Sequence, residues 1–349
     1  MKCIYFLFLL SFFFAACNEE NEKIYTSILA EGQMPNIAKD SNGSLHIVYG
    51  KADSIMYSIS NNNEKSFTAP VLVSILPNLA ASHSRGPQIA ISNNGITVIA
   101  CNTLGDILSF TKNKSGQWQP MARVNDMDTV AKEGLMALSG NKDFLFAVWL
   151  DLRDKHNKIV GSSSVDGGKT WSENKVIYAS PDTTVCECCK PSVVIKENTV
   201  YVMFRNWLGG NRDMYLIKSS DHANTFGEAK KLGNGSWALN GCPMDGGGLT
   251  INNNSIPQTI WRREGKIYAC EPGKAELEIA EGKNGSVEFV NGKNVYAWAE
   301  KGEIIVRNST GMKKNLGKGQ LPLIKGVNNE HIICVWEHEK KIHTALIKI

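Results

Sequence analysis

Four cysteines have the most unusual spacing among the side chains of this sequence that could do chemistry. Cys186, Cys188 and Cys189 form the run CECC, and Cys242 opens the segment CPMD further along the chain. In an oxidising compartment such residues form disulfides by default, and one bridge from the run to Cys242 would stabilise the fold by roughly 4 kcal/mol. The alternative is a thiolate site for copper or zinc, or a redox site, because soft sulfur ligands bind these metals. We expect disulfides in preference to a metal site, and we expect no cofactor apart from a possible metal at these cysteines.

Charged side chains in the loops between apolar runs form the second group of candidates. The candidates for ligand binding are Arg205, Arg212, Arg262 and Asp245. Because a guanidinium binds a carboxylate through two parallel hydrogen bonds, converging arginines suit an anionic ligand. The alternative is that these charges pair with one another, since buried charges in proteins are paired.

A repeated unit supplies the scaffold that these loops need. The chain divides into seven similar units, each with a short apolar strand, a stronger second strand, a third strand that ends in a turn, and a fourth. The units begin near Pro35, Pro87, Leu135, Pro191, Gly248, Ser286 and Leu321. The last unit lacks a fourth strand, and residues 24–29 can supply it, which would close a ring and remove exposed sheet edges.

The fold class follows from these units. No segment after the N-terminal apolar run has the period of a helix, so we predict an all-β chain. We predict a β-propeller of seven four-stranded blades, with the N-terminal strand closing the ring. Six blades are the alternative, because the last three units are shorter and poorly marked. In this geometry the loops before the first strands lie on the same face of the ring as the loops between second and third strands. The candidate residues, which lie in these loops, therefore come together on that face.

Residues 164–171, SVDGGKTW, indicate a tight turn between two strands. Asp166 can accept hydrogen bonds from nearby backbone amides, the glycines allow positive φ, and Trp171 can pack against the blade. Weaker versions of the pattern occur at residues 60–67, 111–118 and 219–226. Their spacing of about 51 to 55 residues is typical of propellers. The pattern resembles the Asp-box, or BNR repeat, of sialidases and related β-propellers.

The sialidase resemblance implies two chemical assignments. Sialidases carry an Arg-Ile-Pro motif whose arginine binds the substrate carboxylate, and Arg85 in the segment RGPQI is similar to it. The acid/base aspartate of the family corresponds to Asp106, which would give and recover a proton during exo-sialidase hydrolysis. The nucleophile in that family is a tyrosine in a late blade. The last unit of this chain contains no tyrosine, so the resemblance leaves catalysis open.

Residues 1–16 are typical of a bacterial lipoprotein signal peptide, because a long apolar run and small residues precede Cys17. We expect Cys17 to carry the lipid, residues 17–23 to form a polar tether, and residues 24–349 to form a single propeller domain. The expected location is therefore the bacterial cell envelope, with the chain lipid-anchored and either periplasmic or at the cell surface.

The overall composition limits the choice of partners. The 349 residues are 42% hydrophobic and 21% charged, with a formal net charge of +4. This balance gives no reason to expect nucleic acid or an anionic lipid surface as a partner. We expect a monomer that meets the membrane only through its lipid anchor and binds a carbohydrate or another anionic small ligand. Three hypotheses remain: a sialidase-like propeller that binds and hydrolyses an anionic glycan, a non-catalytic propeller that binds glycan or protein, and the thiolate site.

Overall fold

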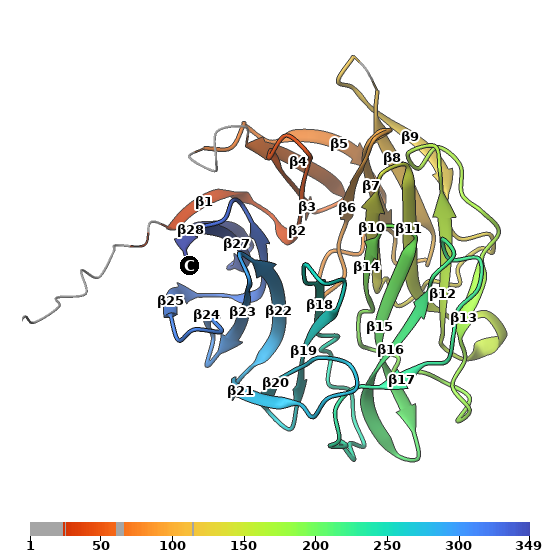
Figure 1. Ribbon diagram of the computed structural model, residues 1–349. Coiled ribbons are helices and arrows are strands. Elements are labelled where there is room, and N and C mark those ends of the chain that lie inside the picture. The colour runs from red at the N-terminus through yellow and green to blue at the C-terminus, as the bar shows by residue number, and fades with distance from the viewer. Residues whose placement is uncertain (1–23, 25, 61–65, 114) are drawn as a thin grey trace, which may run out of the picture.

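The computed structural model describes residue 24 and residues 26–60, 66–113 and 115–349. Seven antiparallel sheets of four strands each are arranged in a ring (Figure 1). The prediction of an all-β propeller with seven blades is confirmed, and the alternative of six blades is wrong. In the part of the chain that the structure describes, the one helical element is the short 3-10 helix η1 (Arg153–Lys155).

The first three blades each contain four consecutive strands. Blade 1 consists of β2 (Gln33–Lys39), β3 (Leu45–Lys51), β4 (Ser54–Ser60) and β5 (Val71–Ile75). Blade 2 consists of β6 (Gln88–Ser92), β7 (Gly95–Cys101), β8 (Ile107–Lys112) and β9 (Trp118–Arg123). Blade 3 consists of β10 (Met136–Asn141), β11 (Phe144–Asp151), β12 (Lys158–Ser164) and β13 (Lys175–Tyr178).

The next three blades repeat this order. Blade 4 consists of β14 (Ser192–Lys196), β15 (Thr199–Leu208), β16 (Asn211–Ser219) and β17 (Lys230–Lys231). Blade 5 consists of β18 (Gly248–Ile251), β19 (Pro257–Arg263), β20 (Lys266–Cys270) and β21 (Leu277–Glu281). Blade 6 consists of β22 (Lys283–Val290), β23 (Lys293–Glu300), β24 (Glu303–Asn308) and β25 (Lys313–Lys318).

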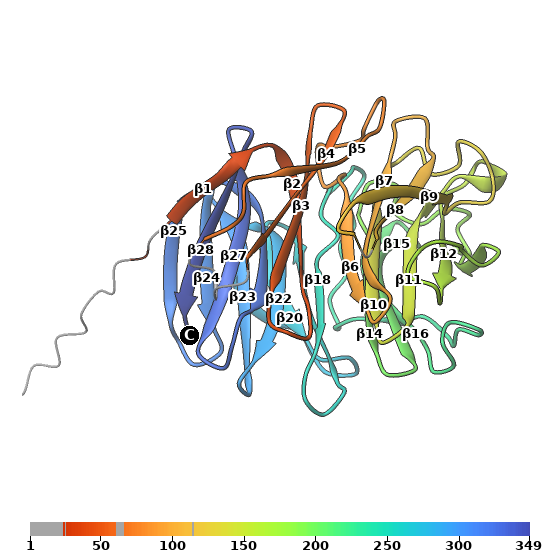
Figure 2. The same cartoon turned by 90° about the horizontal axis from the view of Figure 1, so that it is seen from above.

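Blade 7 is built from both ends of the chain, as the sequence predicts. Its strands are β26 (Gln320–Gly326), β27 (His331–His338), β28 (Lys341–Lys348) and β1 (Thr26–Glu31). Strand β1 pairs antiparallel with β28, and both views of the ring place the two strands side by side (Figure 1, Figure 2). The predicted signal peptide, the predicted lipidation site at Cys17 and the predicted tether lie outside the described residues. No helix in the described residues is long and apolar enough to cross a membrane.

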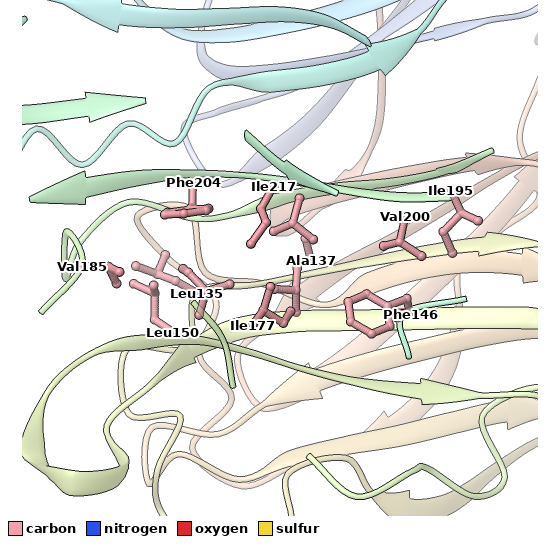
Figure 3. Close-up of a cluster of buried hydrophobic side chains, with 14 of the residues drawn as sticks. Leu135, Ala137, Phe146, Leu150, Ile177, Val185, Ile195, Val200, Phe204 and Ile217 are labelled. Atoms are coloured by element: carbon pink, nitrogen blue, oxygen red, sulfur yellow. The ribbon is translucent and has the colours of Figure 1, made fainter. Parts of the chain in front are cut away.

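The hydrophobic core lies between neighbouring blades. Second strands are covered on both faces, and all eight residues of β11 are buried. Figure 3 shows the cluster between blades 3 and 4, where Phe146 and Leu150 pack towards Phe204 and Ile217. Within the described ranges, one such cluster occupies each of the seven blade interfaces. The ring therefore has a distributed core that leaves its axis open.

The turn at residues 164–171 holds itself together through Asp166. The carboxylate accepts hydrogen bonds from the amides of Lys169 and Thr170 at 3.0 Å and from the Thr170 hydroxyl at 2.7 Å. Burial opposes ionisation, but these bonds outweigh it and hold the pKa of Asp166 below its usual value. Gly168 docks the turn on blade 2, because its carbonyl accepts a hydrogen bond from Ser109 at 2.8 Å. The turn is thus a structural element that joins two blades.

A second turn, at residues 219–226, repeats this bonding in blade 4. The Asp221 carboxylate accepts hydrogen bonds from the amide and the hydroxyl of Thr225, at 2.9 and 2.6 Å. Where the first turn has Gly167 and Gly168, this one has His222 and Ala223, with φ of 56° and 61°. Side chains at positive φ are strained, so the network around the aspartate holds the backbone in an unfavourable region. We call these two segments the aspartate turns.

Candidate functional site

The first strands of the seven blades line a cavity of about 370 Å³ on the axis of the ring. The strand directions place one end of this cavity among the loops that lead into the first strands, and we call these the lead-in loops. Polar side chains near that end are Asn36, Gln88, Lys190 and Asp245. The cavity is within the range of small-ligand pockets. Among the described residues, no arginine and no tyrosine lines it.

Lys190 is the cation at the lead-in end of the cavity. Its Nζ donates a hydrogen bond to Gln88 Oε1 at 2.8 Å, which links the lead-in loop of blade 4 to blade 2. The amide of Gln88 is held in turn by the carbonyls of Gly86 and Pro87, at 2.9 and 3.0 Å. Burial lowers the pKa of Lys190 to about 8. No carboxylate of the described residues forms an ion pair with this ammonium group, so its charge lacks a counter-ion.

Asp245 is buried beside the cavity, and its oxygens bind backbone. One carboxylate oxygen accepts the amide of Asn284 at 2.7 Å, and the other accepts the amide of Gly247 at 3.4 Å. The bond to Asn284 fastens the lead-in loop of blade 5 to the start of β22 in blade 6. Gly246 and Gly247 leave little room for side chains here, since a Cβ on Gly246 would collide with the carbonyl oxygen of Lys190. The glycines therefore serve close packing of two lead-in loops.

The four predicted cysteines come together between blades 4 and 5. Cys188 and Cys242 form a disulfide that joins the two lead-in loops. The Sγ atom of Cys186 lies 3.8 Å from that of Cys188 and 3.5 Å from that of Cys189. Arg212 Nη1 donates a hydrogen bond to Cys186 Sγ at 3.1 Å. A disulfide and a guanidinium in contact with the remaining thiols suit redox chemistry better than a metal ion, which needs free thiolates.

The two thiols have opposite acidities. The hydrogen bond with Cys189, together with the charges of Arg205 and Arg212, lowers the pKa of Cys186 to about 6 although the residue is buried. Burial raises the pKa of Cys189 well above its usual value, and the neighbouring Cys186 adds to the effect. The arrangement therefore favours one thiolate, on Cys186, beside the protonated thiol of Cys189.

Three predicted arginines gather around these loops, and the guanidinium groups of Arg205 and Arg212 are hydrogen-bonded by the protein itself, whereas Arg262 Nε is buried with no hydrogen-bond partner among the described residues. Arg205 is buried and donates to the carbonyls of Asp245, Arg212 and Arg262, at distances from 2.8 to 3.3 Å. Arg205 and Arg262 also lie 5.4 and 5.7 Å from the ring centre of Trp237. We call this region, with the four cysteines, the blade 4–5 junction. Arg205 and Arg212 hold loops together, and none of the three arginines lines the cavity.

Arg85 and Asp106, the two assignments implied by the sialidase resemblance, bind separate partners. Arg85 forms an ion pair with Glu133 at 3.3 Å, between the lead-in loops of blades 2 and 3. Asp106 lies 3.6 Å from Arg123 and accepts the amide of Thr129 at 3.2 Å. Both residues lie on the lead-in face, and neither lines the cavity.

Comparison with known proteins identifies the fold. Neither a protein-family model nor a curated protein sequence matches the chain. An ulvan lyase of polysaccharide lyase family PL25 has 10% identity and a TM-score of 0.59, with 93% of this chain and 96% of the lyase aligned. Virginiamycin B lyase from Staphylococcus aureus has 14% identity and a TM-score of 0.55, covering 93% of this chain and 99% of the lyase.

A sialidase is also among the structures that share the fold. The NanB sialidase from Streptococcus pneumoniae has 12% identity and a TM-score of 0.50, over 93% of this chain and 69% of the sialidase. The chain is a seven-bladed β-propeller. At these identities the likeness establishes the architecture, and the chemistry of the site has to be argued from its own residues.

Sequence reasoning did not select Lys190 or Gln88. Lys190 lies between Cys189 and Pro191 in a lead-in loop, and Gln88 follows Pro87 at the start of β6. Residues at the start of a first strand border the axis of a propeller, so position in the repeat was the signal that could have found them.

Proposed function

We propose that this propeller binds a carbohydrate that carries a carboxylate, at the lead-in end of the axial cavity. The observation that carries the proposal is the ammonium group of Lys190, which borders the cavity and, among the described residues, has only the neutral Gln88 as a hydrogen-bond partner. A bound carboxylate would supply the missing counter-ion, and charge-assisted hydrogen bonds of this kind are among the stronger polar contacts.

The surroundings of Lys190 suit a sugar. Asn36 donates to Gln88 Oε1 at 3.2 Å, so an amide pair lies beside the ammonium group. Sugar hydroxyls bind such amides and exposed backbone groups. The similar ulvan lyase structure contains a glucuronate-rhamnose sulfate ligand, and NanB is a sialidase, so the fold accommodates acidic glycans in other proteins. We place this protein at the bacterial cell envelope, anchored through Cys17.

The proposal concerns binding and does not depend on hydrolysis. The cavity of the described chain lacks the tyrosine that a sialidase mechanism requires. If the resemblance extends to catalysis, sialoside hydrolysis will be lost in both Arg85→Ala and Asp106→Asn. Turnover that survives both substitutions would rule out these two assignments while leaving the binding proposal intact.

Calorimetric titration at pH 6.5 tests the binding proposal. Acidic oligosaccharides containing glucuronate or sialate are compared with neutral oligosaccharides of equal length. We expect only the acidic set to bind, and Lys190→Met to weaken that binding by about tenfold or more. Lys325→Met is the matched control, because Lys325 borders the other end of the cavity and is already paired with Glu288 at 3.1 Å. Equal binding of neutral and acidic glycans, or unchanged binding by Lys190→Met, would overturn the proposal.

A further inference from the structure

The sulfur atoms of the blade 4–5 junction form a continuous path from the surface to the interior. Cys242 is exposed, and its disulfide partner Cys188 is nearly buried. Towards the interior, the Sγ atom of Cys186 lies 3.8 Å from that of Cys188, and the Sγ atom of Cys189 lies 3.5 Å from that of Cys186. Both inner thiols are fully buried. Each sulfur thus touches the next, and only the outermost one reaches solvent.

A structural disulfide would not require this arrangement. The bridge from Cys188 to Cys242 already joins the two lead-in loops, so two further thiols in contact with it add no covalent support. The other buried cysteines of the described chain differ, since Cys101 places its sulfur against the carbonyls of Asn102 and Ala131. Within the described ranges, a guanidinium donates to a cysteine sulfur only at the junction, which favours the thiolate form needed for nucleophilic attack.

We propose that the four junction cysteines form a thiol–disulfide exchange site, in which the inner pair Cys186 and Cys189 reduces the outer Cys188–Cys242 disulfide. This inference is independent of carbohydrate binding. It assigns to the lead-in face a second chemistry, whose partner is a molecule that carries a disulfide or a thiol and that meets Cys242.

The exchange balances without an external oxidant. The thiolate of Cys186 attacks Cys188 Sγ, a bond forms between these two sulfurs, and Cys242 leaves as a thiolate that takes a proton from solvent. Cys189 then loses its proton and attacks Cys186 Sγ, which releases Cys188 as a thiolate that is protonated in turn. The net result is one disulfide broken and one formed, with two electrons and two protons moved from the inner to the outer pair.

The outer dithiol can then react with a partner. Its exposed Cys242 attacks a disulfide of another molecule, and Cys188 resolves the mixed disulfide. The outer disulfide is restored, the disulfide of the partner becomes two thiols, and the inner pair remains oxidised. In the reverse direction a thiol of a partner attacks the outer disulfide at Cys242.

Redox titration of the full chain tests the proposal. The protein is equilibrated in glutathione buffers of graded potential at pH 7, quenched with acid and labelled with N-ethylmaleimide. Cleavage after Glu187 separates Cys186 from Cys188 and Cys189, and fragmentation between these two neighbours in the mass spectrometer then identifies the linked pairs. We expect molecules with one disulfide to include both the Cys188–Cys242 and the Cys186–Cys189 linkage. The overturning result is a Cys188–Cys242 linkage alone at every potential, or a metal ion retained by the reduced protein in its native mass.

Two variants separate exchange from simple reduction. In Cys186→Ser the attacking group is gone, so labelling of Cys242 in the one-disulfide protein, freed of glutathione, should fall about tenfold or more. In Cys189→Ser the first step still occurs, so a Cys186–Cys188 linkage should accumulate with Cys242 free. Cys334→Ser, which removes a buried thiol of β27, is the control and should behave as the wild type. Equal labelling of Cys242 in all three variants would overturn the proposal.

Discussion

The aspartate turns and the blade 4–5 junction hold charged groups in two different ways. Each turn satisfies its aspartate with donors from the same short segment, as Asp221 does with Ser219 and Thr225. In the junction, Arg205 donates to the carbonyls of Asp245 and Arg262, which belong to another blade. Local bonding makes a turn that can be repeated from blade to blade, whereas bonding between blades makes a region that occurs once and can carry chemistry.

The largest expected effect comes from removing the buried guanidinium of the junction. Arg205→Met leaves three buried carbonyls without their donor, so we expect a loss of about 4 kcal/mol in the free energy of unfolding. Urea unfolding followed by tryptophan fluorescence measures it. Arg123→Met is the control, because Arg123 is half exposed and its surface ion pairs should contribute less than about 1 kcal/mol. If Arg205→Met lost less unfolding free energy than Arg123→Met, the bonds between blades at the junction would not be the stronger ones, and the contrast with the aspartate turns would fail.

The second prediction uses Glu276, which also bonds across blades. Burial opposes its ionisation, but the amides of Asn234 and Gly235 and the guanidinium of Arg263 lower its pKa to about 2. Because the pKa of Glu276 is lower in the folded than in the unfolded protein, the ionised carboxylate stabilises the fold at pH values above the unfolded-state pKa. This contribution is lost as the pH falls towards 2. Glu276→Gln should therefore cost about 2 kcal/mol at pH 7 and almost nothing near pH 2.

Unfolding curves for Glu276→Gln between pH 7 and pH 2 provide the measurement. Glu278→Gln is the matched control, since Glu278 forms an exposed pair with Lys266 at 2.9 Å. A difference from the wild type that stays constant over this range would show that the ionised Glu276 is not the stabilising form.

A smaller effect is expected in the first aspartate turn. Asp166→Ala removes bonds to a charged acceptor that lies near the surface, so we expect a loss of about 1.5 kcal/mol. Asp221→Ala should also destabilise the protein, and the double variant should cost the sum of the two single losses, because the two turns share no partner in the hydrogen bonds described. Chemical denaturation of the three variants tests this. Asp143→Ala, in an exposed turn of blade 3, is the control, and strong non-additivity would contradict the local character of the turns.

The smallest effect concerns the backbone of the second turn. Ala223 has φ of 61° where the first turn has glycine, so Ala223→Gly should stabilise the protein by about 0.5 kcal/mol. The reverse change, Gly168→Ala, should destabilise it, because the new Cβ would lie 2.5 Å from Thr97 Cγ2. Thermal unfolding of both variants gives the signs, and a loss of stability in Ala223→Gly would show that the strain is absent.

The sequence predicts most of the fold and much less of the site. Period-two strands and a recurring turn are local patterns, so the seven blades and their closure by an N-terminal strand could be derived. The partners of Arg205 could not, because nothing in a sequence indicates which carbonyls a distant loop leaves unpaired. Cysteine connectivity has the same limit, since four cysteines permit three pairings. Lys190 was missed because its importance comes from its position on the axis and not from a motif.

The closure of blade 7 has a consequence for the time at which the ring can form. Thr26 pairs with Ala345 and Glu31 with Lys341, so the edge of the first described strand, β1, is covered only when the last described strand, β28, is present. A chain that is synthesised from its N-terminus can assemble blades 1 to 6 from neighbouring strands, but it cannot complete the ring until β28 has been made. Until then β1 is an unpaired edge open to other chains, and loss of the final eight or nine residues would make that vulnerable state permanent.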